Sequence, residues 1–282
     1  MNAAKITRES KSNLALAFIS LGGERRRDIT TFYAFCRVID DIADTEELDV
    51  TEKARRLQQW RGWLRASAAD EPSLARELRE VMTKYSLSPE MLEEIIAGVE
   101  MDLVISRYET FEDLRVYCYR VASAVGLVSI EIFGYKNPAC REYAIELGLA
   151  LQTTNILRDV GKDLAVGRIY LPLEDMSRFG YSETDLHAHT HDQRFLNLMN
   201  FEAARAHGYF ERAAALLPPE DRRSMVAAEI MASIYRAILR RMEADKFHVF
   251  ERVYALNKLE KIGRVAAQLF KFFLNSPRGT RV

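Results

Sequence analysis

Proline and glycine are scarce in this sequence, which has 7 prolines and 13 glycines in 282 residues. Because these residues interrupt helices, their scarcity leaves long windows in which apolar side chains recur every three or four positions. No internal repeat is visible, which argues against a solenoid. No Ser-, Gly- or Pro-rich linker divides the chain either. The sequence therefore predicts an all-α protein in which residues 1–282 form one domain.

Cysteine is also rare. Cys36, Cys118 and Cys140 are an odd number, and their spacing is not that of metal ligands. They do not form a disulfide framework, and we interpret them as buried thiols in a reducing cytosol.

Long apolar runs and a charge excess are absent as well. No run reaches the roughly 18 residues of a membrane span, and the opening "MNAAKITRESKS" lacks the apolar core of a signal peptide. The 40 basic and 41 acidic residues nearly cancel, which argues against a nucleic-acid partner. We expect a cytoplasmic protein that is at most peripheral to the inner face of the membrane.

Helix start signals support the all-α prediction. Three Ser, Thr or Asp residues are followed by an acid three positions later, at Asp49, Thr110 and Ser182, as in a capping box. Pro89 and Pro138 are predicted at first helical positions. Helices are expected at residues 12–21, 25–44, 51–68, 72–85, 90–106, 111–134, 138–163, 191–216, 220–246 and 256–274.

The first acidic cluster is D-D-I-A-D, comprising Asp40, Asp41 and Asp44. On a helix Asp40 and Asp44 lie one turn apart, at the end where the macrodipole is already negative. Like charges in this arrangement repel by some tenths of a kcal/mol. Taken alone, the cluster is either a solvated helix end or a cation site.

The second acidic cluster lies on a helix that is apolar nearly all round. Gln152, Asn155, Asp159 and Asp163 follow one another at intervals of three and four, so they share one stripe. A polar stripe on a buried helix must face a partner or a cavity. Gly161 costs roughly 1 kcal/mol in a helix interior, which suggests a functional reason for it.

Together the two clusters offer oxygen ligands without His or Cys, a set that prefers Mg²⁺, or Mn²⁺, over zinc. Mg²⁺ usually completes its shell with water and substrate phosphates. Arg37, Arg158, Lys162 and Arg168 lie close by in the sequence. The acidic clusters, the Mg²⁺ that they would bind and the basic side chains together predict a diphosphate substrate.

Four segments resemble one family, the squalene/phytoene synthases, which are head-to-head trans-isoprenyl diphosphate synthases. "YAFCRVIDDIAD" resembles its first aspartate-rich motif and "LGLALQTTNILRDVGKDLAVGRIYLP" its second. "GVEMDL" and "YCYRVASAVGLVSIEIFG" match two further segments, the latter a helix that lines the prenyl pocket. The resemblance implies an isoprenoid-synthase-type helical bundle around a central cavity.

The resemblance also implies roles for individual residues. The catalytic set is Asp40, Asp44, Asp159, Asp163 and Tyr33. The Mg²⁺ ligands would be Asp40, Asp41, Asp44, Asn155, Asp159 and Asp163. The substrate contacts would be Lys11, Ser12, Phe18, Arg37, Tyr117, Gln152, Asn155, Arg158, Arg168, Tyr235 and Arg252.

The segment "YCYRVASAVG" is most similar to bacterial presqualene diphosphate synthases. We therefore expect two farnesyl diphosphate molecules to be joined to presqualene diphosphate for downstream isoprenoid enzymes. Alternatives are a phytoene synthase that uses geranylgeranyl diphosphate and a complete squalene synthase that also uses NADPH. From other classes, an all-α Mg²⁺-dependent pyrophosphohydrolase and a non-catalytic helical binding protein remain open.

Four features keep two interpretations each. Arg120 faces either the diphosphate or solvent, and His187, His189 and His191 form either a plain loop or a zinc site. Ala122, Ser123, Ala124 and Gly126, with Phe18, Phe32, Tyr33 and Leu157, are either prenyl-pocket lining or ordinary core. The C-terminal helix, with Lys258, Lys261, Arg264 and Lys271 around Phe270, Phe272 and Phe273, docks either on the protein or on an anionic membrane.

Overall fold

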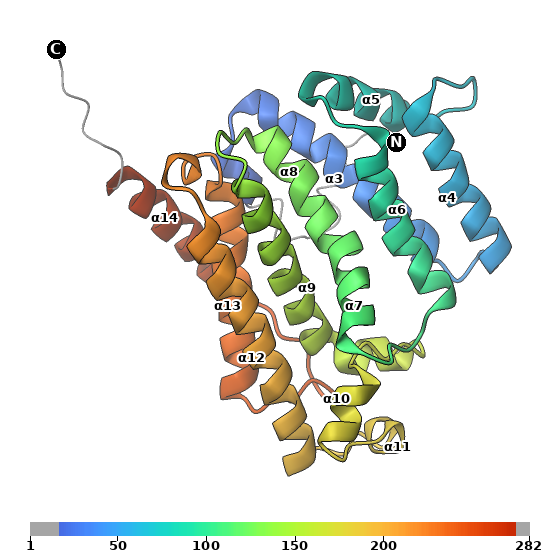
Figure 1. Cartoon of the computed structure of the whole chain (residues 1–282), viewed down its shortest axis with the longest axis vertical. Coiled ribbons are helices and arrows are strands. Elements are labelled where there is room, and N and C mark those ends of the chain that lie inside the picture. Colours follow the sequence, from blue (N-terminus) through green and yellow to red (C-terminus); the bar gives the residue numbers. More distant parts are fainter. Residues whose placement is uncertain (1–16, 275–282) are drawn as a thin grey trace.

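The computed structural model describes residues 17–274 and shows an all-α bundle (Figure 1). Within that range there is no β-strand, only an isolated bridge between Arg107 and Ile169. The longer helices are α3 (Gly23–Asp44), α4 (Val50–Arg65), α5 (Ser73–Tyr85), α6 (Pro89–Val104), α7 (Phe111–Cys118), α8 (Ala124–Phe133), α9 (Cys140–Ala165), α12 (Gln193–Leu216), α13 (Val226–Ala244) and α14 (Lys258–Leu274).

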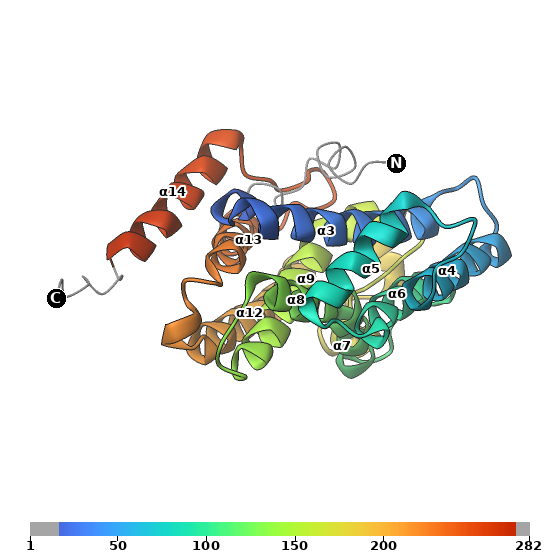
Figure 2. The ribbon, with the colours of Figure 1, turned by 90° about the horizontal axis from the view of Figure 1, so that it is seen from above.

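Helix α9 is the centre of the bundle. It packs against α12, α8 and α13, and α6 packs against α3, α4 and α8. Figure 2 shows α3 lying across one side of the molecule, with α14 projecting beyond α13. The helix that carries the second acidic cluster is therefore surrounded by other helices, as its apolar sequence predicts.

Most of the predicted helix starts are confirmed. Thr110 and Ser182 each form a complete capping box, and Pro89 follows the N-cap residue Ser88. Asp49 accepts a hydrogen bond from the Glu52 backbone N–H. The prediction for Pro138 was wrong: α9 begins at Cys140, because the chain from Asn137 first makes a turn that the Asn137 side chain holds through the Ala139 N–H.

Several predicted segments differ in the structure. The short helices α10 (Leu173–Arg178) and α11 (Glu183–His187) lie between the predicted helices 138–163 and 191–216, where only the start signal at Ser182 indicated a helix. The predicted helix 220–246 begins only at Val226, after the 3₁₀ turn η3 (Pro219–Asp221). Of the predicted helix 12–21, residues up to 16 lie outside the described residues, and the remainder holds the 3₁₀ turn η1 (Phe18–Ser20).

The predicted helix 111–134 is interrupted by a π-helical segment, η2 (Tyr119–Ser123), which joins α7 to α8. Two glycines lie against this segment. A Cβ on Gly98 would come within 2.7 Å of the Arg120 side chain, and one on Gly148 within 2.5 Å of the Ser123 backbone. The π segment is thus held closely between α6 and α9, and such segments are frequent at functional sites.

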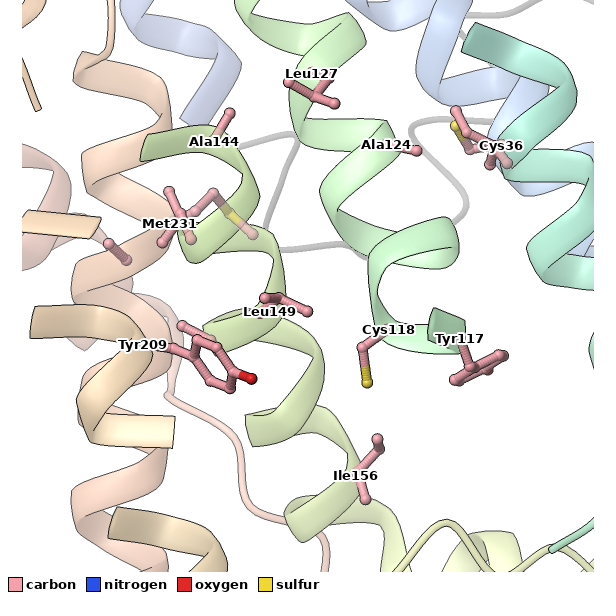
Figure 3. Packing of buried hydrophobic residues seen from close by; sticks show 14 of the residues in the cluster. Cys36, Tyr117, Cys118, Ala124, Leu127, Ala144, Leu149, Ile156, Tyr209 and Met231 are labelled. Atoms are coloured by element: carbon pink, nitrogen blue, oxygen red, sulfur yellow. The ribbon is translucent and has the colours of Figure 1, made fainter. Parts of the chain in front are cut away.

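The interior is a continuous apolar core that includes the three free cysteines. Figure 3 shows members of it on α9, Leu149 and Ile156, and on the neighbouring helix, Cys118 and Ala124. The stretch Phe111–Phe133 is long and apolar enough to cross a membrane by composition alone. Half of its most apolar window is buried against other helices, as in the core helix of a globular domain.

Candidate active site

Two joined cavities lie between the helices. The first, of about 380 Å³, is mainly apolar and is bounded by α3, α8, α9 and α13. The second, of about 300 Å³, is mainly polar and is bounded by α3, α6, α7 and α9. Asp40, Val121, Gln152 and Asn155 line both, so the two spaces meet at these residues. We call them the apolar cavity and the acidic cavity.

The stripe of the second acidic cluster faces the acidic cavity. Gln152, Asn155, Asp159 and Asp163 all line it, as their helical spacing requires. Gly161 does not, and its predicted functional reason was wrong: a Cβ there would lie 2.6 Å from the Val249 carbonyl oxygen. Glycine lets the loop after α13 pack directly on the backbone of α9.

The three aspartates of the first acidic cluster, at the end of α3, do not all face the same side. Asp40 and Asp44 line the acidic cavity, opposite the second cluster. Asp41 lines neither cavity, and its carboxylate pairs with Arg37 at 2.6 Å. The structure therefore brings four of the five predicted aspartates together.

Two of the carboxylates that line the acidic cavity lie in surroundings that disfavour their ionised form. Burial raises the pKa of Asp40 to about 7 against the opposing effect of Arg37, and Asp44 and Asp41 raise it further. Burial likewise raises the pKa of Asp163 to about 7, with a contribution from Asp159. A bound cation would relieve both effects, because it stabilises the ionised form.

Two arginines line the acidic cavity with the aspartates. Arg158 donates two hydrogen bonds to Asp159, at 3.0 and 2.5 Å, and is 19% exposed. Arg168 pairs with Asp44 at 3.3 Å. Lys162 is exposed and lines neither cavity. Arg158 and Arg168 are thus the basic side chains placed to contact an anion there.

One acid of this cavity had no predicted role, although the "GVEMDL" segment contains it. Asp102 on α6 accepts hydrogen bonds from Tyr170 at 2.7 Å and from Tyr117 at 3.0 Å. Tyr170, in the loop after α9, reaches this position because that loop bonds to the loop after α6, for example from the Ile169 N–H to the Ser106 carbonyl. Asp102 and Tyr170 both line the acidic cavity. The resemblance of their segments was the only sequence signal for them.

The residues present fit Mg²⁺. The donor set is entirely oxygen, and the Asn155 Oδ1 is buried without a hydrogen-bond partner at the junction of the two cavities. Across residues 17–274, no three His, Cys, Asp or Glu side chains are arranged to hold an ion by themselves. Mg²⁺ usually takes part of its shell from water and substrate phosphates.

The apolar cavity contains several of the predicted prenyl contacts. Phe18, Tyr33 and Tyr235 line it, and the Phe18 and Tyr33 rings meet edge to face at 6.2 Å. Ala122 and Gly126 line it as well. The other candidates are core residues: Phe32, Ser123, Ala124 and Leu157 are buried and line neither cavity.

Other predicted residues lie elsewhere or outside the described range. Arg252 is not at the cavities: it is 59% exposed and pairs with Asp245 at 3.1 Å. Arg120 lines neither cavity: it is 33% exposed and pairs with Glu94 on α6 at 2.7 Å. Lys11 and Ser12 lie outside the described residues, so their roles stay predictions.

The histidine segment is packed by stacking. The His189 ring stacks on Phe250 at 4.7 Å, and His191 stacks on His248 at 4.4 Å. His191 Nε2 also lies 2.7 Å from the Lys246 carbonyl oxygen. These contacts give the segment a structural role in holding the loop after α13.

Comparison with known proteins agrees with this geometry. The sequence profile of the squalene/phytoene synthases matches residues 7–260. The chain is 37% identical over 262 residues to a 15-cis-phytoene synthase of Synechocystis sp., covering 88% of this chain and 77% of that protein. It is 34% identical to a phytoene synthase of Mycobacterium tuberculosis, covering 94% and 88%.

Solved structures show the same fold. A dehydrosqualene synthase superimposes with a TM-score of 0.84 at 28% identity, covering 98% of this chain and 96% of that one. A squalene synthase of Alicyclobacillus acidocaldarius gives 0.75 at 25% identity, covering 87% and 93%. The predicted all-α isoprenoid-synthase fold is confirmed. The chain belongs to the squalene/phytoene synthase family, and it is a prenyltransferase.

Proposed function

We propose that this protein is a phytoene synthase, which joins two geranylgeranyl diphosphate molecules head to head. The observation that carries the proposal is the junction of an apolar and an acidic cavity at Asp40, Gln152 and Asn155. A prenyl diphosphate has the same division into a hydrocarbon chain and a charged head. The choice of geranylgeranyl over farnesyl diphosphate follows relatives that are named phytoene synthases.

Asp40, Asp44, Asn155, Asp159 and Asp163 would hold Mg²⁺ in the acidic cavity. When bound, the metal would act as a Lewis acid that stabilises negative charge on the departing diphosphate. Arg158 and Arg168 would bind diphosphate oxygens, because guanidinium groups match their geometry. Arg158 would then give up part of its hydrogen bonding to Asp159 and donate to the substrate diphosphate instead.

Cleavage of the C–O bond in the first substrate releases diphosphate and leaves an allylic cation. The apolar cavity, with Phe18 and Tyr33 in its wall, would keep this cation away from water and beside the double bond of the second substrate. Bond formation and loss of a proton give a cyclopropyl diphosphate. Loss of its diphosphate and of a second proton would yield phytoene without a reductant.

This proposal replaces the expected main product. The segment "YCYRVASAVG" predicted presqualene diphosphate from farnesyl diphosphate, but Arg120 in it is paired with Glu94 and does not reach the acidic cavity. Farnesyl diphosphate remains the second candidate substrate, because the chain superimposes on a dehydrosqualene synthase with a TM-score of 0.84. A nucleotide pyrophosphohydrolase would have no use for the apolar cavity.

Product analysis tests the proposal. Purified protein with Mg²⁺ is given geranylgeranyl or farnesyl diphosphate, with and without NADPH, and products are identified by mass spectrometry. We expect phytoene from geranylgeranyl diphosphate at the higher kcat/KM, with no effect of NADPH. Presqualene diphosphate, squalene or dehydrosqualene as the dominant product would overturn the choice of substrate, and diphosphate release from nucleotides would overturn the reaction class.

We also propose peripheral contact of α14 with an anionic membrane. The helix docks on α13 through Arg264, which donates to the Ser233 carbonyl at 3.1 Å. Leu259 and Phe270, however, remain 80% and 64% exposed. Cosedimentation with anionic vesicles should be weakened by Leu259→Glu, and unchanged binding would contradict the contact.

A further inference from the structure

A buried aromatic side chain borders one end of the apolar cavity. Tyr143 in α9 is 1% exposed, its ring lines the cavity, and its hydroxyl donates a 2.8 Å hydrogen bond to Glu229 Oε1 of α13. Burial, reinforced by Glu229, raises the pKa of Tyr143, so the hydroxyl stays protonated and remains a donor. This hydrogen bond to α13 fixes the position of the Tyr143 ring.

A third hollow, of about 420 Å³, lies on the other side of this wall between α9, α12, α13 and α14. Glu229 lines it, and so does Leu147, which lies one turn beyond Tyr143 and also lines the apolar cavity. The two spaces are thus separated by a single layer of side chains. Phe210 and four alanines line part of this hollow, but its surface is mainly polar, because Arg236, Arg240, Arg264 and Gln268 also line it.

Tyr143 lies at the end of the apolar cavity far from the acidic cavity. Asn155, at the junction of the two, follows Tyr143 by twelve residues on the same helix, a distance of about 18 Å. On the neighbouring helix, Val121 lines the junction. Phe133, at the end of α8, lines the apolar cavity. A prenyl chain whose diphosphate is held at Asn155 would therefore extend toward Tyr143.

We propose that Tyr143, anchored by Glu229, is a specificity-determining residue that sets the longest prenyl chain this enzyme accepts. The inference rests on the proposed function, because it requires a prenyl chain in the apolar cavity. Replacing the ring by a smaller side chain would lengthen the apolar cavity at this end, and a chain longer by one isoprene unit would then fit.

The test measures kcat/KM of Tyr143→Leu for farnesyl, geranylgeranyl and geranylfarnesyl diphosphate. We expect the ratio for geranylfarnesyl over geranylgeranyl diphosphate to rise by about tenfold or more, in the range typical of apolar pockets. Tyr143→Phe keeps the ring and should leave the ratio within about twofold of the wild-type value. Leu151→Ala is the matched control, because Leu151 lines the cavity one turn from Asn155, so this change enlarges the cavity near the junction and not at its far end, and its ratio should also change little.

A folded Tyr143→Leu protein with an unchanged ratio would overturn the inference, and so would an equal change in Leu151→Ala. Melting temperatures report folding, and if Tyr143→Leu does not fold, Tyr143→Met provides the same test with a more adaptable side chain. A wild-type preference for farnesyl diphosphate would correct the proposed substrate only. The role of Tyr143 would then be tested by the ratio of kcat/KM for geranylgeranyl over farnesyl diphosphate.

Discussion

At the residue scale, Asp159 and Asp163 lie one turn apart on α9 but have different surroundings. Asp159 is fully engaged by Arg158, whereas no cation among residues 17–274 lies within ion-pair distance of Asp163. Both would ligate Mg²⁺ in the proposed mechanism. Replacing each by asparagine therefore separates a role in catalysis from a role in stability.

We expect Asp159→Asn and Asp163→Asn each to lower kcat by roughly 10²–10³, the usual cost of losing one preorganised electrostatic group. Their stabilities should change in opposite directions. Asp163→Asn removes a repelling charge and should raise the melting temperature of the metal-free protein. Asp159→Asn leaves the half-buried Arg158 without its partner and should lower it. Normal turnover in either variant would contradict the assignment, and thermal unfolding without Mg²⁺ measures the second effect.

The raised pKa of Asp163 also predicts how stability depends on pH. Its ordinary value is 3.8 and its value in the folded protein is about 7. Between these limits the folded state binds more protons than the unfolded state, so the free energy of unfolding falls as pH rises and is level above about 7. Melting curves of the metal-free protein from pH 4.5 to 8 should show this loss, and Asp163→Asn should show less of it. An identical slope in the variant would exclude Asp163 as its source.

At the element scale, the π segment Tyr119–Ser123 depends on its neighbours. Gly148 lets the backbone of α9 approach Ser123, whose hydroxyl donates to the Ile145 carbonyl at 2.8 Å. Val121 and Ala122 within the segment line the cavities. The packing of α9 on η2 thus fixes part of the substrate site.

Gly148→Ala should therefore destabilise the protein by about 1–3 kcal/mol, as overpacking usually does, and should lower activity as well. The new Cβ would lie 2.5 Å from the Ser123 Cα, so one helix has to move. Gly62→Ala is the control, because no atom lies within 4 Å of its Cβ position in α4. It should stabilise by up to about 1 kcal/mol through helix propensity. Denaturant unfolding compares the two, and equal effects would refute the packing explanation.

Periodicity predicts α3 to α9, α12 and α13 because each has an apolar stripe with turns at its ends. It does not predict the π segment, since Gly98 and Gly148, which hold it, belong to other helices. The late start of α13 also results from a long-range contact. The buried Asp221 accepts hydrogen bonds from the Lys136 and Asn137 N–H groups and so fixes the turn before α13. Such elements follow from long-range contacts.

At the scale of the whole molecule, the site is assembled from segments far apart in the sequence. Spacing along one helix predicts the stripe from Gln152 to Asp163. It cannot predict that Tyr170 meets Asp102, or that Arg252 turns to Asp245, because both depend on how loops cross the bundle.

Ligand binding should stabilise the assembled site cooperatively. Mg²⁺ and inorganic diphosphate together should raise the melting temperature more than the sum of their separate effects. Mg²⁺ bound by the aspartates would attract the diphosphate, and diphosphate bound by the arginines would supply further oxygen ligands to Mg²⁺. Asp159→Asn should remove this excess. Differential scanning fluorimetry over a concentration series measures it, and purely additive shifts would argue against a shared Mg²⁺–diphosphate site.

The residues common to both cavities have a further consequence for inhibitors. A small anion in the acidic cavity and a small hydrocarbon in the apolar cavity would each bind weakly and would end at the same wall, at Asp40 and Asn155. Joined by a short tether, each fragment would hold the other at a high effective concentration, and such linkage can add 10² to 10⁴ in affinity. The tether has to be short, because the two cavities meet at these residues. An inhibitor series that varies tether length alone would therefore reach its highest affinity at the shortest tether that still spans Asn155.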